Sequence, residues 1–156
     1  MKKKFYIFTT IFFAIDLITK LFVMKYIKNL TIIPNFLSFY LLKNDGVAFS
    51  LLKGQQILII LISIIALLYI NIKIIKNVKT NKEIILLAMI QGGIIGNLYD
   101  RIIYHEVIDF ISIKIFNYYF PVFNLADVFI CVGAFISIIL IIKGEKNEVS
   151  SRRRKY

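Results

Sequence analysis

Four apolar runs of about 20 residues constrain this chain more than any other feature. They cover residues 5–24, 56–75, 84–103 and 122–142. A helix of about 20 residues crosses the roughly 30 Å of hydrocarbon in a bilayer. Of the 156 residues 59% are hydrophobic, more than a soluble domain of this size can bury. We therefore predict a single all-α membrane domain, residues 1–156, with four transmembrane helices.

Basic residues gather beside the ends of these runs and predict the orientation. They lie in residues 2–4, in the link 76–82 between the second and third runs, and in the tail. Lys and Arg in short flanking segments favour the cytoplasmic side of a membrane. We therefore expect both termini in the cytoplasm, with a disordered basic tail over residues 144–156.

The net charge of +11 could instead suggest that the protein binds nucleic acid. We expect no such partner, because the basic clusters adjoin apolar runs.

The first run also resembles a secretory signal peptide, because three lysines precede it. No small-x-small cleavage site follows, and Asp16 and Lys20 interrupt the run, so we predict an uncleaved helix. The two longer connections, 25–55 and 104–121, then lie outside. In the first of them, Pro34, Gly46 and closely spaced aromatic residues favour short strands around a turn.

Polar side chains of separate runs fall at one depth. At about 1.5 Å per residue they lie in the outer third of the bilayer. They are Asp16, Thr19 and Lys20 of the first run, Asn97, Asp100 and Arg101 of the third, and Asn124 and Asp127 of the fourth. Asn44 and Asp109, from the two outer segments, can cap the same region. We expect one polar site just under the outer surface.

Ionisable groups near hydrocarbon are costly and usually serve a function, so Asp109 and Asp127 are our candidates for a catalytic pair. Other interpretations stay open for the remaining charges. Asp16 and Lys20 have the i,i+4 spacing of a helix-stabilising pair. Asp100 and Arg101 could form an interfacial ion pair with Arg101 reaching outward. Asn124 and Asp127, at i,i+3, share one face of the predicted fourth helix.

Five motifs, in order along the chain, point to a known family. They are Asp16-Leu17-Ile18-Thr19-Lys20, Asn44-Asp45-Gly46-Val47-Ala48-Phe49, Gly96-Asn97-Leu98-Tyr99-Asp100-Arg101, Val107-Ile108-Asp109-Phe110 and Phe123-Asn124-Leu125-Ala126-Asp127. With these motifs the chain resembles the bacterial lipoprotein signal peptidases, signal peptidase II. Each motif alone would be a weak signal, and it is their combination across the four runs that is specific.

The resemblance implies an aspartyl endopeptidase of the bacterial cytoplasmic membrane, with its active site near the outer leaflet. Such an enzyme removes the signal peptide from diacylglyceryl-modified prolipoproteins by cleaving before the lipid-modified cysteine. The motifs imply catalysis by Asp109 and Asp127. They also imply substrate binding by Asn44, Asn97, Arg101 and Asn124, and support of the site by Asp16, Thr19, Lys20, Gly46 and Asp100. The resemblance further implies a small extracytoplasmic β cradle within residues 25–55 and a short, mobile outer helix near residues 104–116.

We expect no cofactor, because the single His and the single Cys form no cluster with metal-ligand spacing. The expected partners are the prolipoprotein substrate and membrane lipid, and we expect a monomer. A proton-coupled carrier is a second hypothesis for buried charges in a membrane, but a carrier places them near the midplane. A membrane scaffold is a third hypothesis, and it leaves the five motifs unexplained.

The orientation can be tested with single cysteines at Ser38 and Asn77 in a Cys131→Ala background. An impermeant thiol reagent should label Ser38→Cys from outside, whereas Asn77→Cys should react only from the cytoplasmic side. Labelling of both positions from outside would contradict the four-span arrangement.

Overall fold

The structure is a computed structural model that describes residues 2–46, 51–76, 78 and 80–153, without the side chains of 75, 76 and 144–153. Four long helices account for most of these residues. They are α1 (Lys2–Tyr26), α2 (Gln56–Lys76), α3 (Asn81–Tyr104) and α4 (Leu125–Arg153). Three of them, α1, α2 and residues Leu125–Lys143 of α4, are long and apolar enough to cross a membrane. The protein is therefore a membrane protein, with many large apolar side chains on its surface.

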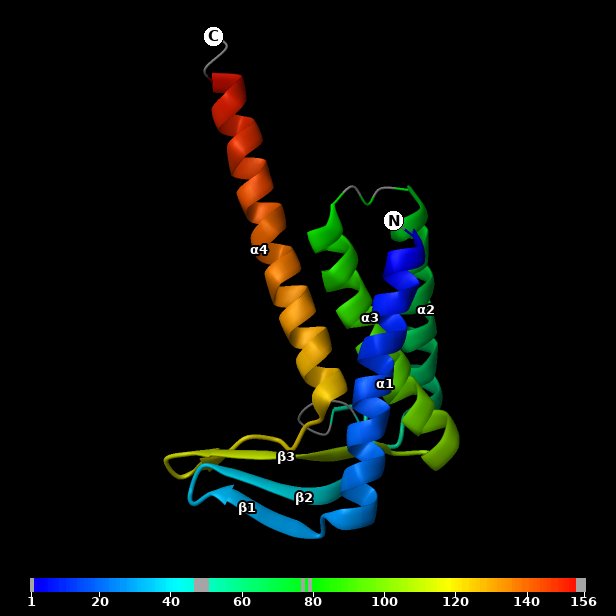
Figure 1. Cartoon of the computed structure of the whole chain (residues 1–156), viewed down its shortest axis with the longest axis vertical. Coiled ribbons are helices and arrows are strands. Elements are labelled where there is room, and N and C mark those ends of the chain that lie inside the picture. Colours follow the sequence, from blue (N-terminus) through cyan, green and yellow to red (C-terminus); the bar gives the residue numbers. More distant parts are fainter. Residues whose placement is uncertain (1, 47–50, 77, 79, 154–156) are drawn as a thin grey trace.

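α3 occupies the centre of the helical part. It packs against α1, α2 and α4, whereas α4 diverges from the other helices toward its C-terminal end (Figure 1). Glycines permit the close approach of these helices. A Cβ on Gly92 would lie 2.7 Å from Cβ of Phe12 in α1, and one on Gly93 would meet the Ala126 carbonyl of α4.

A small antiparallel sheet closes one end of the helices (Figure 1). Its strands, in spatial order, are β1 (Asn29–Ile33), β2 (Leu37–Asn44), β3 (Val107–Ile115) and β4 (Tyr118–Tyr119). β1 and β2 confirm the strands expected within residues 25–55. The part of the second motif at residues 47–49 lies outside the described residues.

The short outer helix expected near residues 104–116 is wrong, because most of that segment forms β3. Residues 111–115 alternate between apolar and polar side chains, and the whole strand is rich in isoleucine, a β-branched residue that favours strands. The fourth helix also differs from its predicted bounds of 122–142. It begins at Leu125 and continues to Arg153, so it covers most of the stretch for which we expected a disordered tail.

A buried ion cluster ties the helices to the sheet. The Lys20 Nζ lies 2.8 Å from Oδ2 of Asp16 and 2.8 Å from Oδ2 of Asp100, and all three side chains are at most 1% exposed. Asp16 therefore forms the i,i+4 pair suggested by the sequence. Asp100 pairs with Lys20 of α1 rather than with its neighbour Arg101.

Both aspartates of this cluster also bind backbone amides of other elements. Asp16 Oδ1 accepts a hydrogen bond from the amide of Ala126 at the start of α4, at 2.9 Å. Asp100 Oδ2 accepts one from the amide of Ile108 at the start of β3, at 3.1 Å. Lys20 is thus connected, through one carboxylate each, to the first turn of α4 and to β3.

Replacing Lys20 with Met should destabilise the protein strongly. The substitution keeps much of the volume but leaves two buried carboxylates without their cation, a loss that typically costs about 3–5 kcal/mol. Thermal unfolding in detergent would measure it. Lys43→Met is the matched control, because Lys43 is 60% exposed and pairs with Glu106 at 3.3 Å, a surface contact worth less than about 1 kcal/mol. Equal stability of the two variants would contradict this account of the cluster.

Candidate active site

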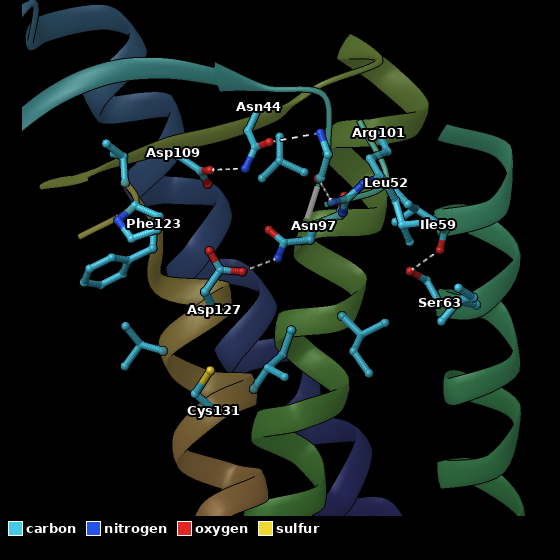
Figure 2. Close-up of a pocket in the computed structure, with 18 of the residues that line it drawn as sticks. Asn44, Leu52, Ile59, Ser63, Asn97, Arg101, Asp109, Phe123, Asp127 and Cys131 are labelled. Atoms are coloured by element: carbon cyan, nitrogen blue, oxygen red, sulfur yellow. Dashed lines mark hydrogen bonds between the residues drawn. The ribbon is translucent and has the colours of Figure 1, made fainter. Parts of the chain in front are cut away.

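The two candidate catalytic aspartates lie on different elements and line one cavity. Asp109 is in β3 and Asp127 is in the first turn of α4. Both border a cavity of about 790 Å³, and Figure 2 shows their carboxylates directed toward the same space. Asn44, Asn97 and Arg101 line this cavity as well.

Asp109 is held by two amide side chains. Its Oδ2 accepts a hydrogen bond from Nδ2 of Asn44 at 2.8 Å, and its Oδ1 accepts one from Nδ2 of Asn124 at 2.7 Å. Asn124 is fully buried, and its Nδ2 also lies 3.0 Å from Oδ1 of Asn97. The carboxylate of Asp109, itself 1% exposed, therefore has a fixed orientation.

Asp127 forms a reciprocal cap with Asn124. The Asp127 amide donates to Oδ1 of Asn124 at 2.9 Å, and the Asn124 amide donates to Oδ2 of Asp127 at 3.2 Å. This arrangement is a capping box, with the acidic side chain at the helix N-terminus where the dipole favours it. Asn124 thus precedes α4, and our prediction that it lies within the helix was wrong. The Nδ2 of Asn97 donates to Oδ1 of Asp127 at 2.8 Å.

Arg101 is 6% exposed, so it does not reach outward as an interfacial anchor. Its Nη2 donates to the carbonyl of Gly46 at 2.9 Å, and its Nη1 to the carbonyl of Asn97 at 3.2 Å. The amide of Gly46 in turn donates to Oδ1 of Asn44 at 2.9 Å. Arg101 therefore holds the turn that orients Asn44 toward Asp109. Within the described part of the chain its Nε has no hydrogen-bond partner.

The residues expected to support the site differ in their positions. Lys20 reaches the site directly, since its Nζ donates to Oδ1 of Asn97 at 3.1 Å. Asp16 and Asp100 contact Lys20 and the neighbouring backbone, as described above. Thr19 is not connected to the site by any described hydrogen bond. Its hydroxyl donates to the carbonyls of Ile15 and Asp16 within α1.

Sequence reasoning missed the apolar part of the cavity lining. These residues come from three helices and include Ile59, Ile62, Ile94, Val128, Cys131 and Val132. No sequence signal distinguishes them, because similar residues fill every membrane helix. The hydroxyl of Ser63, also in the lining, donates to the carbonyl of Ile59 at 2.8 Å.

The surroundings of Asp109 favour its protonated form. Burial, which has the largest effect, and the nearby charge of Asp127 together raise its pKa to about 7. Hydrogen bonds from Asn44 and Asn124 act the opposite way, because they stabilise the carboxylate. A neutral Asp109 beside an ionised carboxylate is the arrangement expected where two like charges share a poorly hydrated site.

No group of three or more His, Cys, Asp and Glu side chains is placed to hold a metal ion in the described residues. The polar groups that the site offers are two carboxylates, amide side chains and one guanidinium. Such groups can move protons and bind a peptide backbone. The expected lack of a cofactor stays a prediction.

Comparison with known proteins agrees with this geometry. The profile of the family described as Signal peptidase (SPase) II matches residues 8–143. The chain is 40% identical to a lipoprotein signal peptidase of Clostridium tetani, with 86% of this chain and 89% of that protein aligned. It is 34% identical to the lipoprotein signal peptidase of Staphylococcus aureus, over 95% and 96% of the two chains.

A solved structure described as a bacterial membrane enzyme has the same fold. It superposes with a TM-score of 0.85 at 29% identity, covering 92% of this chain and 90% of the other. A second structure with that description gives a TM-score of 0.80 at 30% identity, over 89% and 92% of the two chains. With the profile match and these relatives, the chain belongs to the signal peptidase II family.

Proposed function

We propose that this protein is a membrane aspartyl endopeptidase that removes signal peptides from prolipoproteins by cleaving before a lipid-modified cysteine. The observation that carries the mechanism is the placement of Asp109 and Asp127 on one cavity, linked through Asn124. Family membership supports the peptidase activity and argues against the carrier hypothesis. The aspartyl type and the cleavage position are parts of our proposal.

Peptide hydrolysis can proceed with two carboxylates that share one proton. The ionised Asp127 would take a proton from a water molecule as that water attacks the scissile carbonyl carbon. The protonated Asp109 would donate to the carbonyl oxygen, and the amine would receive a proton when the C–N bond breaks. The raised pKa of Asp109, about 7, supports giving it the role of the acid.

The cavity also suggests how the substrate is held. Arg101 lines the cavity, and its guanidinium offers N–H donors for a backbone carbonyl of an extended peptide. Apolar side chains of α2, Ile59 and Ile62, and of α4, Val128 and Val132, also line the cavity. This apolar stretch suits the hydrophobic segment of a signal peptide.

The proposed orientation follows from the same site. We propose that α3 is the fourth transmembrane helix, despite its buried polar residues, because it lies among the three apolar ones. Basic flanks favour cytoplasmic termini, and this orientation would put the sheet and the site at the outer end. A lipid anchored in the outer leaflet would then hold the scissile bond near Asp109 and Asp127.

Asp109→Asn and Asp127→Asn should each abolish cleavage. Asparagine keeps the shape but cannot exchange the proton, and loss of an acid or base typically lowers the rate by about 10²–10⁴-fold or more. The double variant should be no worse than either single one, because the two carboxylates act as a unit. A gel-shift assay on a lipid-modified prolipoprotein with purified variants would measure this.

Asp45→Asn is the matched control for these substitutions. Asp45 adjoins Asn44 but does not line the cavity, and its backbone carbonyl rather than its carboxylate accepts the hydrogen bond of Gln56 at 2.8 Å. We expect this variant to cleave like the unmodified enzyme. Substantial activity in either catalytic-pair variant would remove that aspartate from the mechanism.

Cleavage should also depend on pH. If Asp109 is the acid, kcat/KM should decline as the pH rises through about 7, where its pKa lies, and Asp45→Asn should show the same profile. A profile that stays flat well above that pH would contradict the assignment of Asp109 as the acid.

The pH dependence of stability provides a second measurement of the protonation of Asp109. The folded protein binds the Asp109 proton more tightly than the unfolded chain, whose aspartate has the ordinary pKa of 3.8. The free energy of unfolding should therefore fall as the pH rises from that value to about 7, and then level off. Asp109→Asn should lose this part of the decline.

A further inference from the structure

In the outer part of the sheet, beyond Phe110 of β3, one face is apolar, and this face is the one that carries Asp109. Side chains alternate along a strand, so Ile111, Ile113 and Ile115 share the face of Asp109 in β3. Ile113 of β3 pairs with Leu37 of β2, which pairs with Ile33 of β1, so these three residues form an apolar row across the sheet. The adjacent row on the opposite face consists of Ser112, Ser38 and Thr31. Residues opposite one another in register share a face, so this outer part of the sheet is amphipathic. Nearer the site, the face opposite Asp109 carries Ile108 and Phe110, which are buried within the protein.

The turn between β3 and β4 projects an aromatic side chain. Ile115 pairs with Tyr118, so residues 116 and 117 form a two-residue turn. Phe116 has a φ of 54°, in the left-handed region, and is 92% exposed. Turns with such a φ usually use Gly, Asn or Asp, because a bulky side chain is strained there. Within the described protein Phe116 gains almost no burial, so packing of the fold does not explain it.

The residues beside Phe116 resemble those found at a membrane–water boundary. Tyr118 and Tyr119 are 56% and 63% exposed, and the ring centres of Tyr118 and Phe120 lie 5.2 Å apart in an edge-to-face arrangement. Lys114 Nζ lies 5.0 Å from the ring centre of Tyr119. Tyrosine and lysine are typical of interfacial anchors, where the apolar part is immersed and the polar end meets headgroups.

The hairpin lies where lipid would surround the helices. β3 runs across the ends of the helices and extends sideways past the foot of α4 (Figure 1). The face that carries Asp109 points toward the cavity and therefore toward the helical side of the sheet (Figure 2). The exposed apolar side chains of α4, such as Phe135 and Ile138, cover the part of the protein that faces lipid. The apolar face of the sheet thus continues this lipid-facing surface.

We propose that the hairpin 115–118 inserts into the boundary between headgroups and acyl chains of the adjacent phospholipid leaflet, with Phe116 as its anchor. The outer part of the apolar face then lies on the bilayer, and the exposed Thr31 on the opposite face of β1 lies in water. The anchor holds β3, and with it Asp109, at a fixed depth relative to the membrane. This inference depends on the membrane location of the protein and not on the proposed cleavage reaction.

The absence of tryptophan from the chain permits a direct test. Phe116→Trp places a single fluorophore at the tip, and Thr31→Trp places one on the exposed polar face of β1 as a matched control. Both full-length variants are reconstituted into phosphatidylglycerol vesicles with or without brominated acyl chains. We expect Phe116→Trp to emit at shorter wavelength and to lose most of its emission to the brominated lipid. Thr31→Trp should instead be quenched by aqueous iodide.

Two outcomes would overturn the proposal. Equal accessibility of both tryptophans to iodide, without quenching by brominated lipid, would place the tip in water. A short emission wavelength at Phe116→Trp that brominated lipid does not quench would mean that another protein surface, such as a second copy of this chain, covers the tip. Because neither readout requires catalysis, an inactive preparation would still test the inference.

Discussion

The arrangement of the site depends on one buried cation between two buried carboxylates. Lys20 pairs with Asp16 and Asp100, and all three are shielded from water. In such surroundings an unpaired charge would be far more costly than in water, so the three groups fix one another's positions. Each carboxylate also binds a backbone amide next to a candidate catalytic residue, Ala126 before Asp127 and Ile108 before Asp109. The cluster therefore aligns α4 and β3. Its carboxylates, Asp16 and Asp100, are not among the residues that line the cavity.

Two asparagines extend this alignment to the carboxylates of the site. Asn97 receives a hydrogen bond from Lys20 and donates one to Asp127. Asn124 caps α4 and donates to Asp109. Amide side chains suit this position because each offers both a donor and an acceptor without adding charge. Two carboxylates of like charge can then remain close in a poorly hydrated place, provided that one of them keeps a proton.

Sequence patterns predicted the four long helices well, because hydropathy and helical rise depend little on tertiary contacts. They also predicted that Asp16, Asn97 and Asp127 would lie at one level, and the structure links these residues through the Lys20 cluster. The outer helix was wrong because the resemblance suggested it, whereas the isoleucine-rich composition of residues 107–115 and the alternation of residues 111–115 favour a strand. The capping role of Asn124 was missed because hydropathy cannot locate a helix start to within a few residues. The apolar lining of the cavity had no distinguishing signal at all.

The central claim, that Asp109 and Asp127 share one proton near neutral pH, can be measured without a substrate. Infrared spectroscopy detects the carbonyl band of a protonated carboxyl group, and Asp109→Asn identifies which band belongs to Asp109. The account predicts that this band persists in the folded protein until the pH rises through about 7, and that it disappears at lower pH in Asp127→Asn, where the neighbouring charge is absent. A band that already disappears in the ordinary acidic range of aspartate, with or without Asp127, would contradict the account.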